Sequence, residues 1–403
     1  MTARRFLWVF GPGLMVMLAD TDAGSIVTAA QSGAAWGYRL LFLQVLLVPV
    51  LYVVMELTVR IGVTTGKGHA ALIREQFGGG WAAISVGALV VAAVGALVTE
   101  FAGIAGIARL FGLPAAVLVL PAAVFLIGLV VAGTYRRVEV VGVALGLLEV
   151  AFVVAAVLVH PHAGDVAHGL SPAQPFASSG FLALVAANIG AVVMPWMVFY
   201  QQGAVLDKGL RAGDLRAART DTAIGAVLTQ VVMASVLVAA AATLHATGRP
   251  LSSIGDLDAA LAPVVGPSAA RIVLAGGVLG ASFVAAIVVA LALAWAVAEG
   301  FGKPHSLGDT PRRARLFYGI YAGAVAVGAG LVLADGSLVQ LAVRVEILNA
   351  LLLPLVLGFL VALAFRVLPR RYALPRRARV ALAGTVAVVV ALGLLSAGFA
   401  FGL

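Results

Sequence analysis

Acidic and hydroxyl-bearing residues interrupt an apolar stretch near the N-terminus. The run Asp20-Thr21-Asp22-Ala23-Gly24-Ser25 lies inside a segment that is otherwise apolar from about Trp8 to Ala34. Carboxylates inside a bilayer are costly unless they face a cavity, a cation or a partner. These residues are also poor in a helix interior, so the helix should unwind and offer its carbonyls to an ion. We therefore predict a cation site on a broken membrane helix, with an acidic helix end at the membrane surface as the alternative.

The apolar segment at 179–205 carries a second interruption. Pro195 lies in its middle, with Asn188 and Gly190 shortly before it. Proline removes a backbone hydrogen bond and clashes with the preceding turn, which predicts a break near Val193. Alone, such a proline could simply kink a helix, but it falls five predicted helices after the first break. That spacing is typical of two inverted repeats that each begin with a broken helix.

Further charged residues lie within apolar segments. Glu100 is a candidate for lining an ion pathway, with pairing to an arginine as the alternative. Glu149 is either a proton or ion relay or a buried acid with an ordinary hydrogen bond. Arg344 and Glu346 are two residues apart, so on a helix they do not share a face, and at least one should meet another helix.

The composition is that of a membrane protein. The chain is 63% hydrophobic and 11% charged, with a mean hydropathy of +1.11, which is far outside the range of soluble domains. Its 403 residues fit one membrane domain, and its net charge of +9 lies in short loops between apolar spans, which excludes nucleic-acid binding. Cysteine is absent, and no nucleophile or ATPase motif is present, so we expect neither an enzyme nor a resident cofactor.

Eleven apolar segments are long enough to cross a membrane. They fall at roughly 8–34, 40–62, 82–111, 114–133, 138–160, 179–205, 220–246, 268–300, 314–333, 337–366 and 380–402. With the N-terminus inside, all but five of the 26 lysines and arginines lie in inner loops, as the positive-inside rule requires. We expect a multi-pass protein of the plasma (inner) membrane with an external C-terminus. An outer loop holds His160, His162 and His168, for which weak metal collection is a hypothesis and a solvated loop is the simpler interpretation.

Two motifs at the breaks resemble those of the natural resistance-associated macrophage protein (NRAMP) family. Gly11-Pro12-Gly13, followed after eight residues by Asp22-Ala23-Gly24-Ser25, is similar to the family's first helix, whose signature is Asp-Pro-Gly-Asn. Ala191-Val-Val-Met194-Pro195-Trp196 is similar to the helix 6 signature Ala-x-x-Met-Pro-His. Thr65-Gly66-Lys67 and the segment from Thr99 to Gly103 match in place as well. The resemblance covers predicted helices one to ten.

The resemblance implies an all-α integral membrane fold of the amino acid–polyamine–cation superfamily type. Residues 1–367 would form a ten-helix core of two inverted five-helix repeats, at about 1–162 and 175–367, with broken helices 1 and 6. Residues 368–403 would form a basic loop and an accessory eleventh helix. By the same resemblance, the metal ligands would be Asp22, Ser25, Met194 and the carbonyl of Ala191.

Departures from the family pattern point to a particular branch. Ser25 replaces the asparagine of helix 1, Trp196 and Gln201 replace two histidines of the family's proton route, and Glu346 stands where helix 10 often has glutamine. Histidine is the side chain best suited to carry protons near neutral pH. The pattern resembles the NRAMP-related magnesium transporter branch, in which a larger pocket accepts a partly hydrated ion, and it implies transport without obligatory proton coupling.

Ligand chemistry favours the same substrate. Mg²⁺ prefers hard oxygen ligands and keeps part of its water shell, whereas thioether ligands suit softer ions. Carboxylates, hydroxyls and amides could surround such an ion or line its pathway, with Trp196 as a wall; the candidates are Asp20, Glu100, Gln201, Gln202 and Glu346. We expect a monomeric importer of Mg²⁺, and also of Mn²⁺, in the lipid bilayer. A proton-coupled Mn²⁺/Fe²⁺ transporter and, less favoured, an amino-acid transporter of the same architecture are the alternatives.

Overall fold

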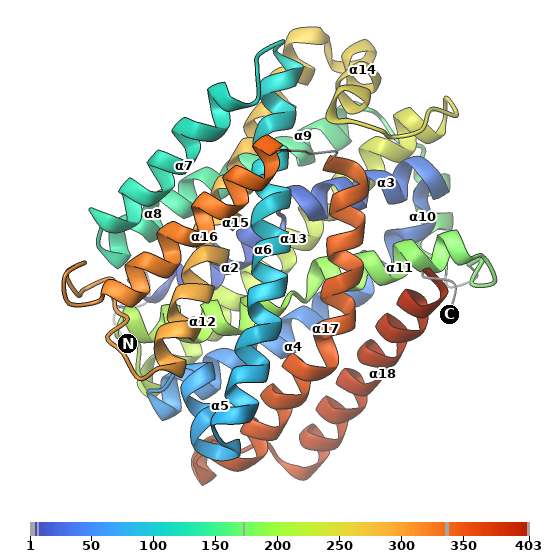
Figure 1. Cartoon of the computed structure of the whole chain (residues 1–403). Helices are drawn as coiled ribbons and strands as arrows, with labels where there is room; N and C mark the ends of the chain where they lie inside the picture. The colour runs from blue at the N-terminus through green and yellow to red at the C-terminus, as the bar shows by residue number, and fades with distance from the viewer. Residues whose placement is uncertain (1–4, 6–7, 172–173, 335–337, 401–403) are drawn as a thin grey trace.

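The computed structural model describes residue 5 and residues 8–171, 174–334 and 338–400, and these residues form helices and loops without a strand (Figure 1). Residue 337 and residues 401–402, at the ends of the last two predicted spans, lie outside this range. The α-helices are α2 Pro12–Asp20, α3 Ala23–Trp36, α4 Leu41–Thr65, α5 His69–Phe77, α6 Gly79–Leu110, α7 Ala116–Val131, α8 Tyr135–Gly146, α9 Val150–Leu158, α10 Ala163–Gly169, α11 Ser179–Val192, α12 Pro195–Asp207, α13 Leu215–Ala240, α14 Ile254–Val265, α15 Pro267–Gly300, α16 Arg315–Ala334, α17 Leu338–Val367 and α18 Arg376–Ala400. Short 3₁₀ segments are η1 Gly37–Leu40, η2 Leu147–Glu149, η3 Ala212–Asp214 and η5 Arg370–Tyr372, and η4 Ala241–His245 is a π-helix.

Nine helical stretches of the described residues are long and apolar enough to cross a membrane. One of them, Ala23–Thr65, is 43 residues long because the single turn of η1 joins α3 to α4. Helix α7, with 16 residues, is apolar but shorter than the usual span. The predicted number of eleven helices is therefore not confirmed by length and composition.

The first predicted break is confirmed. Helix α2 ends at Asp20, and Thr21 and Asp22 leave the helical conformation, with ψ values of 45° and 175°. Asp22 then acts as the N-cap of α3, because its carboxylate accepts the backbone N–H of Ser25 at 2.7 Å. Aspartate is a favoured N-cap residue because it satisfies an amide that the helix leaves open. The residue that breaks the helix thus also starts the next one.

The second predicted break is also confirmed. Helix α11 ends at Val192, Val193 and Met194 leave the helical conformation, and α12 begins at Pro195. Proline is well suited to the first position of a helix, where its missing N–H removes no intrahelical bond. The sequence Val-Met-Pro therefore ends one half-helix and starts the other.

The broken helices lie inside the bundle and the last helix lies outside it. Helix α15 packs along α6, and α13 packs along α2, α3 and α4. Helix α18 packs on α11 and α17 at one edge of the molecule (Figure 1), and outward residues such as Val380 and Leu395 are 67% and 62% exposed. An exposed apolar face of this kind suits contact with lipid.

Glycines bring the central helices into close contact. A Cβ at Gly190 of α11 would lie 1.8 Å from the carbonyl oxygen of Glu346 on α17, and one at Gly33 of α3 would lie 2.3 Å from the carbonyl oxygen of Leu237 on α13. Small residues at helix interfaces allow backbones to approach in this way. The contact at Gly190 positions Glu346 beside the broken helices.

Candidate metal-ion site

Asp22 lies at the start of α3, where its two carboxylate oxygens have different surroundings. Its Oδ1 accepts the N–H of Ser25, whereas its Oδ2 is buried and has no hydrogen-bond partner among the described residues. The partial positive charge at the N-terminus of α3 favours the ionised carboxylate. Asp22 can therefore keep its capping bond and still offer an oxygen to a cation.

Glu100 and Glu346 meet the same short stretch from two other helices. The N–H of Ala23 donates to Glu100 Oε2 at 3.2 Å, which brings α6 to the break. A Cβ on Gly24 would lie 2.6 Å from Glu346 Oε1 and 3.3 Å from Asp22 Oδ1, so the absence of a side chain there lets these two acids approach.

The two glutamates repeat the arrangement of Asp22. Asn349 donates to Glu346 Oε2 at 2.9 Å, but Glu346 Oε1 and Glu100 Oε1 are buried without a partner in the described part of the chain. Asp22, Glu100 and Glu346 thus each hold one oxygen in a hydrogen bond to the chain, and the carboxyl groups of Asp22 and Glu100 also lie against each other.

Ser25 and Ala191 join the two broken helices. The hydroxyl of Ser25 donates to the carbonyl of Ala191 at 3.3 Å, so the start of α3 and the end of α11 lie side by side. Met194 follows three residues later as the N-cap of α12 and is fully buried. These positions therefore lie at two adjoining breaks, and in this structure the hydroxyl of Ser25 donates to the carbonyl that an ion would use.

The other candidate residues have different surroundings. Asp20 lies at the end of α2 beside Thr229 of α13, and Asp22 and Glu346 are among its charged neighbours. Both polar atoms of the Gln202 amide have partners: Oε1 lies 3.2 Å from His69 Nδ1, and Nε2 donates to the carbonyl of Lys67 at 2.9 Å. Gln202 thus holds the loop between α4 and α5. Gln201 and Trp196 are buried, and their Oε1 and Nε1 atoms have no partner among the described residues.

The side chains around Gly24 are buried. Asp22, Glu100, Ser25 and Met194 are each 0% exposed and Glu346 is 1% exposed. No three His, Asp or Glu side chains in the described ranges form a ready-made metal centre. Further ligands for an ion must then come from carbonyls, hydroxyls, a thioether or water, and a hydrated ion would need the site to widen.

Charge balance indicates the kind of ligand. No ion pair within the described residues joins Asp22, Glu100 or Glu346 to a basic side chain. Arg344 is exposed while Glu346 is buried, in agreement with the prediction that they do not share a face. Buried charges are otherwise paired or bound to metal, so this excess of carboxylates favours a cation.

Charged residues that the sequence analysis missed hold the start of α2. Asp221 of α13 accepts the N–H groups of Gly11, Gly13 and Leu14 at 3.2, 2.7 and 3.1 Å. Lys208 donates to the Phe10 carbonyl and to Glu139, each at 2.7 Å. An acid near the beginning of the apolar segment 220–246 was the available signal for Asp221. These bonds fix α2, the first half of the broken helix.

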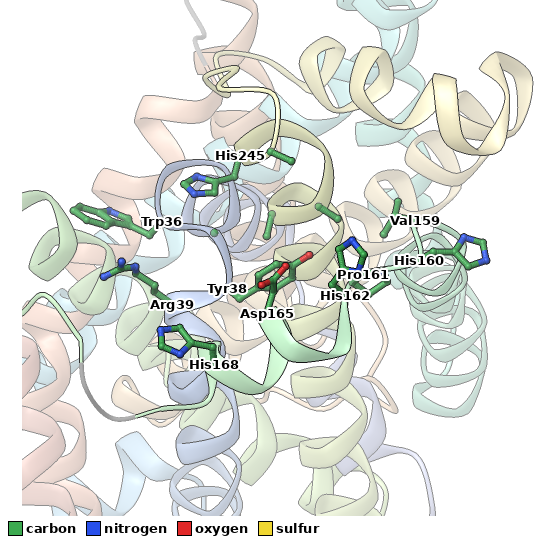
Figure 2. Close-up of a pocket in the computed structure, with 15 residues that line it drawn as sticks. Trp36, Tyr38, Arg39, Val159, His160, Pro161, His162, Asp165, His168 and His245 are labelled. Carbon is green, nitrogen blue, oxygen red and sulfur yellow. The ribbon is translucent and has the colours of Figure 1, made fainter.

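The loop histidines line a cavity of about 550 Å³ that is separate from the group around Gly24. Figure 2 shows His162, His168 and His245 around it, with Tyr38 and Asp165 between them and His160 directed away. His245 Nδ1 lies 3.0 Å from the carbonyl of Ala34, which ties η4 to α3. Because the described residues form no three-ligand metal centre, the hypothesis of metal collection gains no support here.

Comparisons with known proteins agree on one family. The sequence profile described as "Natural resistance-associated macrophage protein-like" matches residues 13–397. The chain is 32% identical over 295 residues to "Divalent metal cation transporter MntH 1" of Pseudomonas aeruginosa, covering 69% of this chain and 66% of the relative. It is 30% identical over 283 residues to a Brucella suis protein named "Divalent metal cation transporter MntH", covering 66% of this chain and 61% of that relative. The matches therefore span a little less than two thirds of these relatives.

Solved structures share the fold. The manganese transporter of Eremococcus coleocola superposes with a TM-score of 0.77 at 20% identity, over 98% of this chain and 87% of that one. Mhp1, a nucleobase-cation-symport-1 family transporter, superposes with a TM-score of 0.60 at 16% identity, over 96% of this chain and 90% of the other. At these identities the likeness concerns the arrangement of helices alone.

Proposed function

The chain belongs to the natural resistance-associated macrophage protein-like family, and from this membership and the geometry around Gly24 we propose that it transports divalent metal cations, with Mg²⁺ and Mn²⁺ as substrates. The observation that carries the proposal is the convergence of Asp22, Glu100 and Glu346, each with a free, buried oxygen and no basic partner among the described residues. A divalent cation compensates two carboxylates at once. Carboxylate, hydroxyl and carbonyl oxygens are the ligands that Mg²⁺ and Mn²⁺ prefer.

The broken helices supply the means of transport. Unwound segments at Asp22 and at Met194 expose backbone carbonyls to the ion while their half-helices lead to opposite sides. Alternating access would move the inner half α2, now held by Asp221 and Lys208, and the outer half α3 in turn. The membrane potential contributes about 2.3 kcal/mol per elementary charge per 100 mV, so a divalent cation can be imported without ATP.

The topology proposed with this function has eleven spans. The stretch Ala23–Thr65 would cross twice, turning at η1, and α7 would cross as a short helix. The ten-helix core would consist of two inverted repeats at about 1–162 and 175–367, and α18 would be an accessory helix. The whole protein would lie in the inner membrane. The N-terminus would be cytoplasmic and the C-terminus external.

Proton coupling separates the proposal from its nearest alternative. His69 contacts Gln202 at the loop after α4, and positions 196 and 201 hold tryptophan and glutamine, so we propose transport that does not require a proton. The alternative is a proton-coupled transporter of Mn²⁺ and Fe²⁺. It is favoured by Met194, whose thioether at the break of the sixth span suits softer ions.

Uptake into proteoliposomes tests the proposal, with internal Mg²⁺, Mn²⁺ and pH followed together. We expect Mg²⁺ and Mn²⁺ to enter without acidification. Asp22→Asn and Glu100→Gln should lower the rate about tenfold or more, because a lost carboxylate–cation contact exceeds about 1.4 kcal/mol. Glu75→Gln, at an acid exposed on the inner loop, is the matched control and should transport normally. Mn²⁺ entry with acidification, and no entry of Mg²⁺, would establish the alternative.

A further inference from the structure

The turn that joins α17 to α18 is strongly basic. Residues 366–379, which we call the basic turn, include six arginines and no acid. Five of these arginines are exposed, namely Arg366, Arg370, Arg371, Arg376 and Arg377. Within the described residues, no ion pair joins any of the six to an acid, whereas Lys67 and Arg313 in other loops do pair with acids. The positive charge of the basic turn is therefore left for a partner outside this part of the chain.

The basic turn is anchored to the bundle at two points. Arg60 of α4 donates to the backbone carbonyl of Tyr372 at 3.0 Å. Arg366, near the end of α17, donates to the carbonyl of Gln76 on α5 at 3.3 Å. Figure 1 shows the turn at the same end of the molecule as α5. The exposed arginines between and beyond these anchors are thus presented from a fixed backbone.

Aromatic side chains beside the basic turn indicate where the membrane surface lies. The guanidinium of Arg366 lies 4.5 Å from the ring centroid of Phe77. Phe359 packs against Phe77 and Trp81, with ring centroids 5.4 and 5.9 Å apart, and Trp81 is 52% exposed. Exposed tryptophan is enriched at the boundary between membrane and water, because its ring is amphipathic. This aromatic cluster therefore places Arg366 at the level of lipid headgroups.

Helix α18 continues from the basic turn as an apolar surface. Arg376 and Arg377 are its first two residues, and Val380, one turn further on, is 67% exposed. The guanidinium of Arg379 lies 5.6 Å from the ring centroid of Phe365, which is 40% exposed. Arginines at a helix end can keep the charged group at the interface while their stems cover apolar surface. A lipid whose tails lie along α18 would therefore bring its headgroup to the basic turn.

We propose that the basic turn binds the headgroup of an anionic phospholipid. Each guanidinium presents a planar fork of N–H donors that matches two oxygens of a phosphate. Clusters of about four to eight basic residues beside a membrane helix are typical of such recognition. A zwitterionic headgroup carries its own ammonium group and compensates the arginines less well. This binding does not depend on which ion the protein transports.

The apolar surroundings favour a lipid over a soluble anion. Inorganic phosphate could use the same arginines, but it would make no contact with the exposed faces of Val380 and Phe365. A phospholipid uses both features at once, because its phosphate and its acyl chains are covalently joined. The lipid would hold the adjoining ends of α17 and α18 together, and so it would stabilise the folded protein.

Melting temperatures of the purified, detergent-solubilised full chain test the lipid site, with dioleoylphosphatidylglycerol or dioleoylphosphatidylcholine added in equal amounts. The anionic lipid should raise the melting temperature of the wild type by several degrees more than the zwitterionic lipid. A basic-turn variant should lose most of that difference; it combines Arg370→Gln, Arg371→Gln, Arg376→Gln and Arg377→Gln. A matched control removes the same charge from exposed positions elsewhere and should keep the difference; it combines Arg216→Gln, Lys303→Gln, Arg312→Gln and Arg315→Gln.

The comparison separates a lipid site from general attraction and from folding defects. The four arginines of the basic-turn variant are exposed, so it should melt like the wild type in phosphatidylcholine. If it does not fold, Arg376→Gln with Arg377→Gln alone repeats the test and should lose part of the difference. A full response to phosphatidylglycerol in the folded variant, or an equal loss in the control, would overturn the proposed site. Inorganic phosphate without lipid should leave the melting temperature unchanged, and a rise equal to that from phosphatidylglycerol would replace the lipid by a soluble anion.

Discussion

At the residue scale, the candidate site depends on how each acid divides its two oxygens. Asp22 uses one oxygen to cap α3, and Glu346 uses one to accept from Asn349, so each has a fixed orientation and a free oxygen. The side chain of Ser25 lacks the amide carbon of the asparagine in the related motif and is shorter by one bond, and here its hydroxyl contacts the carbonyl of Ala191. An ion that takes this carbonyl must displace the serine or bind through it.

Met194 provides a test of selectivity at the same scale. Replacing Met194 with Ala removes the thioether from the break but leaves the carboxylates, so Mn²⁺ uptake should fall several-fold while Mg²⁺ uptake changes little. Competition between Mn²⁺ and Mg²⁺ in proteoliposomes measures this ratio. Met197→Ala, at another fully buried methionine of α12, is the control and should leave the ratio unchanged. An equal loss for both ions would mean that Met194 only packs.

At the element scale, two contacts between helices position the site and the half-helix beside it. Gly190 lets α11 lie directly against the carbonyl of Glu346 on α17, and Asp221 holds the N-terminus of α2 against α13. The first contact brings an acid to the breaks, and the second fixes the half-helix that must move. Both depend on backbone atoms, which cannot rearrange as a flexible side chain can.

Gly190→Ala should therefore destabilise the protein. Its Cβ would lie 1.8 Å from a backbone oxygen, so α11 and α17 must separate, and overpacking of this kind typically costs about 1–3 kcal/mol. A lower melting temperature in detergent and a slower metal uptake are the expected results. Gly87→Ala on α6, where a Cβ meets open space, is the control and should melt no lower than the wild type. If both variants melt alike, close packing at Gly190 does not explain the contact.

At the scale of the whole molecule, ion pairs tie the N-terminal end of the chain to α13 and its neighbours. Arg5 pairs with Asp214 at 2.7 Å, and Glu56 pairs with Arg60 at 2.7 Å and with Arg219 at 3.0 Å. The cavity of Figure 2 lies at the C-terminal end of α3, between η1, α10 and η4. With the proposed orientation, these ion pairs lie on the cytoplasmic side of the protein.

The proposed orientation can be tested with single cysteines, since the chain has none of its own. Arg249 and Arg312 are both exposed, and they lie in loops that the basic-residue pattern assigns to opposite sides. A membrane-impermeant maleimide applied to right-side-out vesicles should label Arg249→Cys. It should label Arg312→Cys only after the vesicles are permeabilised. The reverse pattern would invert the topology.

The parts of this protein that follow from local chemistry could be read from the sequence. The breaks at Asp22 and Pro195 were predictable because an N-capping acid and a proline act on the backbone of their own segment. The membrane class, the positions of the buried acids and the separation of Arg344 from Glu346 followed from composition and helical period.

Contacts between segments were decided only by the tertiary structure. The side chain of Glu149 lies beside Thr21, Asp221 accepts from the first N–H groups of α2, and Gln202 holds the loop after α4 instead of joining the group around Gly24. None of these follows from sequence, because uniformly apolar helices carry little information about which face meets which neighbour. The choice depends on how closely small residues let backbones approach, as at Gly190 and Gly33, and that is a property of the packed bundle.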